Sequence, residues 1–334
     1  MTEISIIVPV YNNVQTIDRC VSSVIRQTFF DIELILINDC SDDGSWEKLS
    51  DLAKAHRKIK LINHATRQSA SIARKNGIHA SLGNFIMFLD ADDFLDDFAC
   101  EKALAAIRSR RVDILQFGTF IRDNGATPQQ LAWFERFVNN KVVGPLIGPL
   151  IKYCFLDKRF PFTLWNKIYR ASLVKIAAAN VPDQPTFKAQ DLLLQFFILM
   201  YAVSFDAVDE ALIHYSYGEG ITGGSNFDQK KLDMHMSQVK VALEIFAYLE
   251  RRHASQVFDA ILRQIAKHLI IDNLHSVQLC KDTDLETYAK KSFLASWGDG
   301  IGRFPSTFPV GFSRLLKEVM SESPFNEQLL AMRG

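Results

Sequence analysis

The chain has 334 residues, and 48% of them are apolar, which is enough for a nucleotide-binding domain with a large core and one smaller domain. Lysine plus arginine and aspartate plus glutamate both number 38, so the formal net charge is zero and a nucleic-acid partner is not expected. The five cysteines are scattered without C-x-x-C spacing, which favours reduced packing residues over a disulfide framework or a zinc site.

The first ninety residues alternate short apolar runs with amphipathic segments. Buried strands are predicted at Ile4–Val10, Ile32–Asn38, Ile59–Asn63 and Phe85–Leu89. Helices are predicted at Thr16–Gln27, from about Trp46 to His56, and at Ser69–Ala80. This cadence is typical of βαβ units, so we expect an α/β fold with a parallel sheet.

An acidic run follows the strand Phe85–Leu89. Asp90, Asp92 and Asp93 come directly after it, and Asp39 follows the strand Ile32–Asn38. Ligands of open α/β sheets bind at the carboxyl ends of the strands, and crowded carboxylates repel one another unless a hard divalent cation or a proton relieves them. A solvated acidic loop is the alternative, whereas an EF-hand is excluded because Leu95 takes the loop position that needs glycine.

The sequence contains neither a G-x-G-x-x-G loop nor a Walker A motif, so a bound phosphate needs another partner, for which a metal ion is the obvious candidate. A series of segments between residues 4 and 222 carries a family pattern: Ser5–Asn13, Glu33–Asp39, Ser41–Ser45, Ala73–Gly77, Phe88–Asp93, Leu164–Arg170, Ala189–Leu192 and His214–Tyr217 with Thr222. In this order and spacing they resemble family 2 glycosyltransferases of the GT-A fold. The resemblance implies a Rossmann-like, mostly parallel sheet flanked by helices. It also implies inverting, metal-dependent transfer of a hexosyl or N-acetylhexosaminyl group from a nucleotide sugar to a saccharide or lipid-linked acceptor.

The resemblance places the nucleotide at the first two strand ends, against Pro9, Tyr11, Asn12 and Asp39. A carboxylate there can accept a hydrogen bond from a uracil imide, and UDP is the nucleotide we expect. The alternative for Asp39 is a turn or helix-capping aspartate.

The D-x-D pattern of the family matches Asp90, Ala91 and Asp92. It implies that Asp92 coordinates Mn²⁺ or Mg²⁺ at the donor diphosphate, while Asp90, a second candidate ligand, lies against the ribose with Ala91 beside the donor. His214 falls where some relatives place a histidine near the metal and the diphosphate. The alternative for His214 is a core histidine.

Four more residues are implied to contact donor or acceptor. Arg74 stands in R-K-N-G where the family often has R-N-x-G, and it is expected at the nucleotide or sugar, with Arg67 at a phosphate. Trp165 is expected to line the sugar or acceptor site, and Lys167 is expected near phosphate. A solvated helix charge is the alternative for Arg74, and simple packing is the alternative for Trp165.

Asp191 matches the second acid of the family's Glu-Asp pair, which implies that it is the general base. The first acid is replaced by Gln190, and the loss of a neighbouring like charge should lower the pKa of Asp191. The alternative is an aspartate that caps the following helix.

Residues 226–334 form the second predicted domain, after a GT-A domain at residues 1–225. Val257, Ile261, Ile265 and Leu269 have helical spacing, and a shorter helix is predicted near Leu285–Phe293. A basic side formed by Arg251, Arg252, Arg263, Lys267 and His268 is read as solvated, or else as docking to a partner or an anionic membrane. Glu219–Ser225 is a candidate lid, and Ser296–Gly311 reads as a loop.

No secretory signal and no run of 18 apolar residues is visible, so we expect a cytoplasmic protein, at most attached to the inner face of the membrane. Self-association is left open. Two other functions compete with transfer: an inactive nucleotide-binding scaffold, which Gln190 and R-K-N-G would favour, and a nucleotidyltransferase, which would release pyrophosphate.

Overall fold

The computed structural model describes residues 2–123, 125–140, 142, 144–219, 228–252, 256–280 and 282–298. The chain divides into two compact units. Unit 1 comprises Met1–Pro185 and Gln190–Gly223, and unit 2 comprises Thr186–Ala189 and Gly224–Gly334. The domain boundary at residues 225 and 226 stays a prediction. Residues 220–225 of the candidate lid and 299–311 of the expected loop lie outside the described residues.

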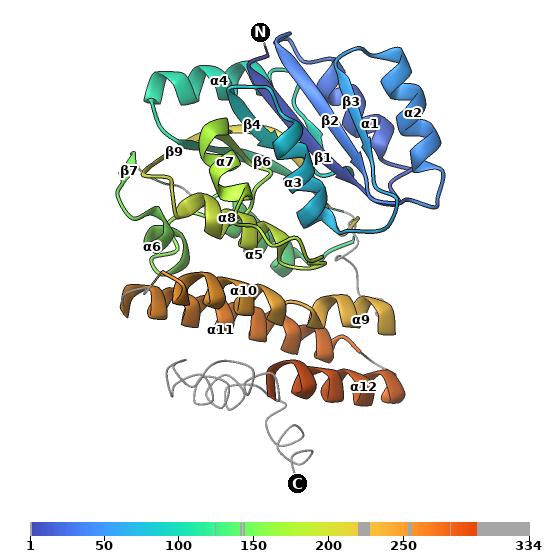
Figure 1. Ribbon diagram of the computed structural model, residues 1–334, viewed down its shortest axis with the longest axis vertical. Coiled ribbons are helices and arrows are strands. Elements are labelled where there is room, and N and C mark those ends of the chain that lie inside the picture. The colour runs from blue at the N-terminus through green and yellow to red at the C-terminus, as the bar shows by residue number, and fades with distance from the viewer. Residues whose placement is uncertain are drawn as a thin grey trace. The chain divides into compact units, whose positions relative to one another are not determined.

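The four strands expected from the sequence form one half of the sheet in unit 1. They are β1 (Ile4–Val10), β2 (Ile32–Asn38), β3 (Ile59–Asn63) and β4 (Phe85–Phe88). They lie in the order β3-β2-β1-β4 and all pair in parallel, as predicted. The helices between them are α1 (Ile17–Ile25), α2 (Ser45–Ala55) and α3 (Ala70–Ala80), drawn in blue to cyan in Figure 1.

The other half of the sheet mixes parallel and antiparallel strands. It contains β8 (Lys167–Arg170), β6 (Ile114–Asp123), β9 (Ser204–Tyr217), β5 (Phe94–Leu95) and β7 (Leu146–Ile147). β8 runs antiparallel to β4 and to β6, while β9 runs parallel to β6 and antiparallel to β5 and β7. The helices of this half are α4 (Ala99–Arg110), α5 (Pro128–Val138), α6 (Leu150–Phe155), α7 (Ala171–Ala178) and α8 (Gln190–Leu199).

Helices cover both faces of the parallel strands, which explains why those strands read as continuous apolar runs. Ile4, Ile6 and Val8 belong to a core that includes side chains of α1 and α4. On the other face α3 approaches β1 and β2 at Gly77, where a Cβ would lie 2.5 Å from Ile7 Cγ2. The missing side chain therefore fixes how closely α3 packs on the sheet.

The parallel register brings the two acidic strand ends to one edge of the sheet. Val10 pairs with Asn38, and Ile7 pairs with Phe88, so Asp39 and Asp90 both follow strands that end on the same side as β1. The Asp39 amide also donates to the Val10 carbonyl at 2.8 Å. This is the edge at which an open α/β sheet binds its ligand.

Unit 2 is helical in its described part, with α9 (Gln229–Met236), α10 (Val239–Glu250), α11 (Gln256–Gln278), α12 (Thr283–Phe293) and a π-helical turn at Leu294–Gly298. Ile261, Ile265 and Leu269 of α11 are buried as predicted, whereas Val257, in its first turn, is 49% exposed. Arg251 and Arg263 are exposed. No helix in the described ranges has both the length and the apolar character needed to cross a bilayer.

Candidate active site

The acidic run forms a tight turn between β4 and β5. The Asp93 amide donates to the Asp90 carbonyl at 3.0 Å, and Ala91 is buried between the two aspartates. Asp93 is also buried, and its Oδ1 accepts from the Ser216 amide at 2.7 Å. Its Oδ2 has no hydrogen-bond partner among the described residues.

Burial and mutual repulsion govern the charges of this turn. Burial, followed by the charge of Asp90, raises the pKa of Asp92 to about 7. Burial and the charges of Asp92 and Asp90 raise the pKa of Asp93 well above its usual range. The turn therefore holds more negative charge than its surroundings balance, which is a situation that a cation relieves.

Arg19 of α1 is a residue of this site that the sequence analysis did not identify. Its Nη2 donates to the Asp92 carbonyl at 2.6 Å, to Ser216 Oγ at 3.1 Å and to Glu219 Oε2 at 3.0 Å. The Ser216 hydroxyl in turn donates to the same Asp92 carbonyl at 2.8 Å. Because Arg19 lies off the apolar stripe of its helix, it resembles any solvated helix charge in the sequence.

Arg74 of α3 is 3% exposed and lies between two carboxylates. Its Nη2 donates to Asp90 Oδ1 at 2.7 Å, and its Nη1 is 3.0 Å from Asp191 Oδ1. The solvated alternative for Arg74 is therefore wrong. One guanidinium joins the first acid of D-x-D to the acid that the resemblance identifies as the base.

Asp191 lies in the first turn of α8, and burial raises its pKa. The charge of Arg74 opposes this shift, the charge of Asp90 adds to it, and a hydrogen bond from the Leu164 backbone opposes it. The expectation of a lowered pKa was wrong, because it counted the missing carboxylate at Gln190 but not the burial. A raised pKa suits a group that must accept a proton near neutral pH.

Asp39 is 3% exposed, and both of its carboxylate oxygens accept hydrogen bonds from the protein. Its Oδ1 accepts from the His64 ring at 2.8 Å and from the Gln68 amide at 2.7 Å, while Oδ2 accepts from the Ser69 amide at 2.7 Å. Asn76, the asparagine of R-K-N-G, donates to the other ring nitrogen of His64 at 2.9 Å. Asp39 thus ties the end of β2 to the start of α3, and its contact with a uracil stays a prediction.

The remaining candidates for the nucleotide lie at the same edge. The Arg67 guanidinium lies over the Tyr11 ring, with its carbon 3.9 Å from the ring centroid. Asn12 has a positive φ of 54°, and its side-chain amide donates to Asp42 Oδ1 at 2.7 Å. Pro9 lies within β1, where it pairs with Ile37 of β2. The residues that follow Pro9, rather than its own ring, therefore reach the carboxyl edge of the sheet.

Trp165 lies in the buried turn before β8, and Lys167 is the first residue of that strand. Trp165 is 4% exposed and stacks on Tyr215, with centroids 4.6 Å apart. The Lys167 ammonium donates to the Thr163 carbonyl at 2.7 Å and to Asn166 Oδ1 at 2.8 Å, with no exposed surface. The assignment of Lys167 to phosphate is therefore corrected: the side chain holds its own turn, and burial lowers its pKa to about 7.

His214 also requires a correction. Its ring lies between Phe94, at 4.4 Å, and Phe120, at 4.7 Å, and burial lowers its pKa. No three histidine, cysteine, aspartate or glutamate side chains in the described ranges converge as metal ligands. The structure therefore does not bring His214 to Asp90 and Asp92 as a third ligand, because β9 directs it into an aromatic stack.

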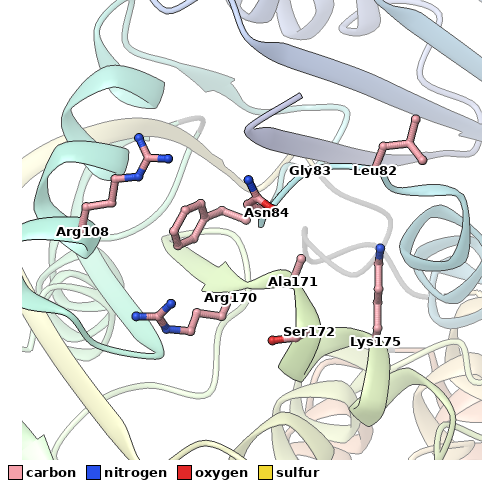
Figure 2. Close-up of a pocket in the computed structure, with 9 residues that line it drawn as sticks. Leu82, Gly83, Asn84, Arg108, Arg170, Ala171, Ser172 and Lys175 are labelled. Atoms are coloured by element: carbon pink, nitrogen blue, oxygen red, sulfur yellow. The ribbon is translucent and has the colours of Figure 1, made fainter. Parts of the chain in front are cut away.

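A cavity of about 640 Å³ lies at the amino end of β4, the end opposite Asp90, and is lined by Asn84, Arg108, Arg170 and Lys175 (Figure 2). Its cations already have partners: Arg108 pairs with Glu3 at 2.6 Å, and Lys175 donates to the Ser81 carbonyl at 2.9 Å. The acidic turn follows the other end of β4 and is therefore separate from this cavity.

The chain is similar to the glycosyltransferases of one family. The family profile described as Glycosyl transferase family 2 matches residues 5–173. The chain is 30% identical over 246 residues to the uncharacterized glycosyltransferase EpsJ of Bacillus subtilis (strain 168), covering 72% of this chain and 69% of EpsJ. It is 28% identical over 189 residues to WfgD of Escherichia coli, described as a UDP-Glc:alpha-D-GlcNAc-diphosphoundecaprenol beta-1,3-glucosyltransferase, covering 53% of this chain and 73% of WfgD.

Among solved structures, S. aureus TarS 1–349 in complex with UDP-GlcNAc matches with a TM-score of 0.63 and 18% identity, covering 99% of this chain and 88% of that one. At this identity the likeness concerns the fold alone.

Proposed function

Because this chain belongs to glycosyl transferase family 2, we propose that it transfers a sugar from a UDP-sugar to an acceptor hydroxyl during surface-polysaccharide synthesis. WfgD, named for UDP-Glc and a diphosphoundecaprenol-linked acceptor, supports this choice of donor and acceptor class. TarS, which shares the fold, was solved with UDP-GlcNAc, a donor of the same nucleotide class. A lipid-linked saccharide acceptor would be met at the cytoplasmic face of the membrane.

The observation that carries the proposal is the double pairing of Arg74. The guanidinium lies 2.7 Å from Asp90, the acid expected at the donor, and 3.0 Å from Asp191, the candidate base. Both carboxylates therefore lie next to the same side chain. A transfer reaction needs this closeness, since the acceptor oxygen must meet the anomeric carbon within about 3–3.5 Å.

Asp191 would act as the general base. Its carboxylate would take the proton of the acceptor hydroxyl while that oxygen attacks the anomeric carbon from the face opposite the diphosphate, which inverts the configuration. Burial raises the pKa of Asp191 and so brings its basicity closer to the operating pH, while the charge of Arg74 opposes the shift. Arg74 and the Leu164 backbone would hold the carboxylate in one orientation.

Asp92, with Asp90 beside it, would hold Mn²⁺ or Mg²⁺. The residues fit such an ion, because they are hard oxygen ligands and because burial and the charge of Asp90 raise the pKa of Asp92 to about 7, a repulsion that a cation would relieve. Two carboxylates suffice, since Mg²⁺ sites of this kind take their other ligands from substrate phosphates and water. When bound, the ion supplies positive charge to the departing diphosphate.

The nucleotide would occupy the edge formed by the ends of β1 and β2. The stacked pair of Tyr11 and Arg67 offers a flat surface and a positive charge there, which suits a base with its attached phosphates. Asp39 would contribute through the backbone that it orders, and its remaining lone pairs could accept from the uracil imide.

Two measurements test the proposal. Calorimetry with UDP and Mn²⁺ should show binding that EDTA and Asp92→Asn each weaken at least tenfold. UDP released from UDP-glucose or UDP-N-acetylglucosamine, with water as the acceptor, should fall at least a hundredfold in Asp191→Asn while UDP binding stays within twofold of wild type.

Asp97→Asn is the matched control, because Asp97 belongs to the same acidic stretch but is exposed and pairs only loosely with Arg26 at 3.6 Å. It should leave both measurements unchanged. Full turnover by Asp191→Asn would exclude this base, UDP binding without turnover by any protein would favour the inactive scaffold, and release of pyrophosphate would identify a nucleotidyltransferase.

A further inference from the structure

The segment Thr186–Ala189 belongs to unit 2, although unit 1 supplies the chain on both sides of it. Asp191 follows this segment by two residues and lies in unit 1. We propose that unit 2 positions the general base through Lys188, whose ion pair and hydrogen bond anchor the chain directly before Asp191. This inference rests on the proposed role of Asp191, and it assigns Lys188 as a positioning residue.

Lys188 is held by two side chains of the helical unit. Its Nζ lies 3.3 Å from Asp272 Oδ2 of α11 and 3.3 Å from His235 Nδ1 of α9. The lysine side chain is 18% exposed, so water screens this pair less than an ordinary surface pair. Burial alone would raise the pKa of Asp272, but the charge of Lys188 and a hydrogen bond from Gln238 outweigh it, so the pKa of Asp272 is lowered.

The partners of Lys188 are themselves fixed in place. An ammonium group can only donate, so the contact at 3.3 Å makes His235 Nδ1 the acceptor from Lys188. Ser276 Oγ also lies 2.7 Å from this nitrogen, and its hydroxyl donates to the Asp272 carbonyl at 2.9 Å. Burial and the charge of Lys188 lower the pKa of His235 to about 3, in agreement with a neutral ring. The Asn273 amide donates to the His235 carbonyl at 2.7 Å, which joins α9 to α11. The anchor is thus part of a buried polar network rather than a single flexible contact.

The connection from Lys188 to Asp191 is short and conformationally restricted. Three residues reach at most about 10 Å, so a displaced anchor moves the backbone of Asp191 directly. Ala189 has a φ of 59°, a left-handed conformation that is unfavourable for alanine because its Cβ crowds the following carbonyl oxygen. Such a conformation persists only where the residues on both sides are held. Lys188 holds one side, while Arg74 holds Asp191 on the other at 3.0 Å.

Loss of the anchor should therefore affect the chemical step more than donor binding. Without Lys188 the segment can release the left-handed turn at Ala189 and shift the first turn of α8. A displacement of about 1 Å at a reacting group costs on the order of a hundredfold in rate. None of the residues proposed for the nucleotide lies in this segment, so the KM for the donor should stay nearly constant.

The test uses the full chain with Lys188→Met, Lys188→Arg and Lys230→Met. Lys230 is an exposed lysine of α9 and serves as the matched control. The UDP-sugar that wild type hydrolyses fastest, UDP-glucose or UDP-N-acetylglucosamine, provides kcat and KM. In Lys188→Met we expect kcat to fall at least tenfold and KM to stay within twofold, with half or more of kcat restored in Lys188→Arg.

Hydrogen exchange provides a second reading that does not depend on turnover. In Lys188→Met the amides of Gln190–Leu199 should exchange at least tenfold faster than in wild type, while the amides of β1 should exchange at the wild-type rate. In Lys230→Met both sets of amides should exchange at the wild-type rate. Unchanged exchange in Gln190–Leu199, or a kcat within twofold of wild type, would overturn the proposal. Full turnover by Asp191→Asn would refute the assignment of Asp191 as the base. Loss of turnover in Asp191→Asn with full turnover in Lys188→Met would refute the role of Lys188 and leave the assignment of Asp191 intact.

Discussion

Replacement of Lys167 by methionine should remove a pH dependence of folding that the buried ammonium creates. Lys167 has no exposed surface, and burial lowers its pKa from 10.5 to about 7, against the smaller opposing effects of Cys154 and Asp191. Below pH 7 the folded and unfolded chains both carry the proton, and the folded state bears the cost of a buried charge. Between pH 7 and 10.5 the unfolded chain binds one proton more, so the free energy of unfolding rises with pH.

The slope is about 1.4 kcal/mol for each pH unit in this window, so the two units from pH 7 to 9 contribute at most about 3 kcal/mol. Lys167→Met has no group that titrates there, but it also loses the hydrogen bonds to Thr163 and Asn166, a penalty that does not change with pH. The stability of wild type relative to the variant should therefore increase by about 1–3 kcal/mol from pH 7 to pH 9.

Urea denaturation of both proteins at pH 7 and 9, at constant ionic strength, measures this difference, and subtraction removes the contribution of other titrating groups. Lys175→Met is the matched control, because Lys175 is an exposed lysine of the next helix, and its pH dependence should equal that of wild type. Equal slopes for wild type and Lys167→Met would refute the reasoning, since Lys167 would then be charged in the folded state throughout.

Three further outcomes follow from the packing. Gly77→Ala should lower the free energy of unfolding by about 1–3 kcal/mol in urea titrations, since its Cβ would lie 2.5 Å from Ile7 Cγ2; a stabilised variant would show that α3 can move away from the sheet. Arg74→Met should cost about 3–5 kcal/mol in the same assay, because two carboxylates lose their partner, and a loss under 1 kcal/mol would contradict the pairing. Cys40 is the one exposed cysteine of the five, so a thiol reagent should modify one group rapidly in the native protein and none in Cys40→Ser; rapid modification of a second thiol would show that the burial is incomplete.

The first half of the fold could be predicted because its information is local. Each buried parallel strand is a continuous apolar run, and the fourth strand was predicted one residue too long. The second half could not be predicted in the same way. β9 carries the acids Asp206, Asp209 and Glu210 in a strand buried only in part, and β5 is a two-residue strand that exists only through its pairing with β9.

The candidate site divides along the same line. Acids at strand ends can be recognised from sequence, because the strand that precedes them is recognisable. Which groups neutralise those acids depends on contacts between residues far apart in the chain, so the double pairing of Arg74 and the contacts of Arg19 were not foreseen. Lys167 was misassigned for a related reason: a lysine in a motif suggests an exposed charge, whereas here the turn encloses it.

The bonds of Asp39 have a consequence for engineering. They join the end of β2 to the loop His64–Ser69 and to the start of α3, and Arg74 lies on this helix. A loop graft between relatives that replaces residues 64–69 alone would remove the His64 side chain and change the placement of the two backbone amides that donate to Asp39, and so would shift the start of the helix that carries Arg74. Chimeras between relatives that exchange this region should therefore transfer Asp39, residues 64–69 and α3 through Asn76 together.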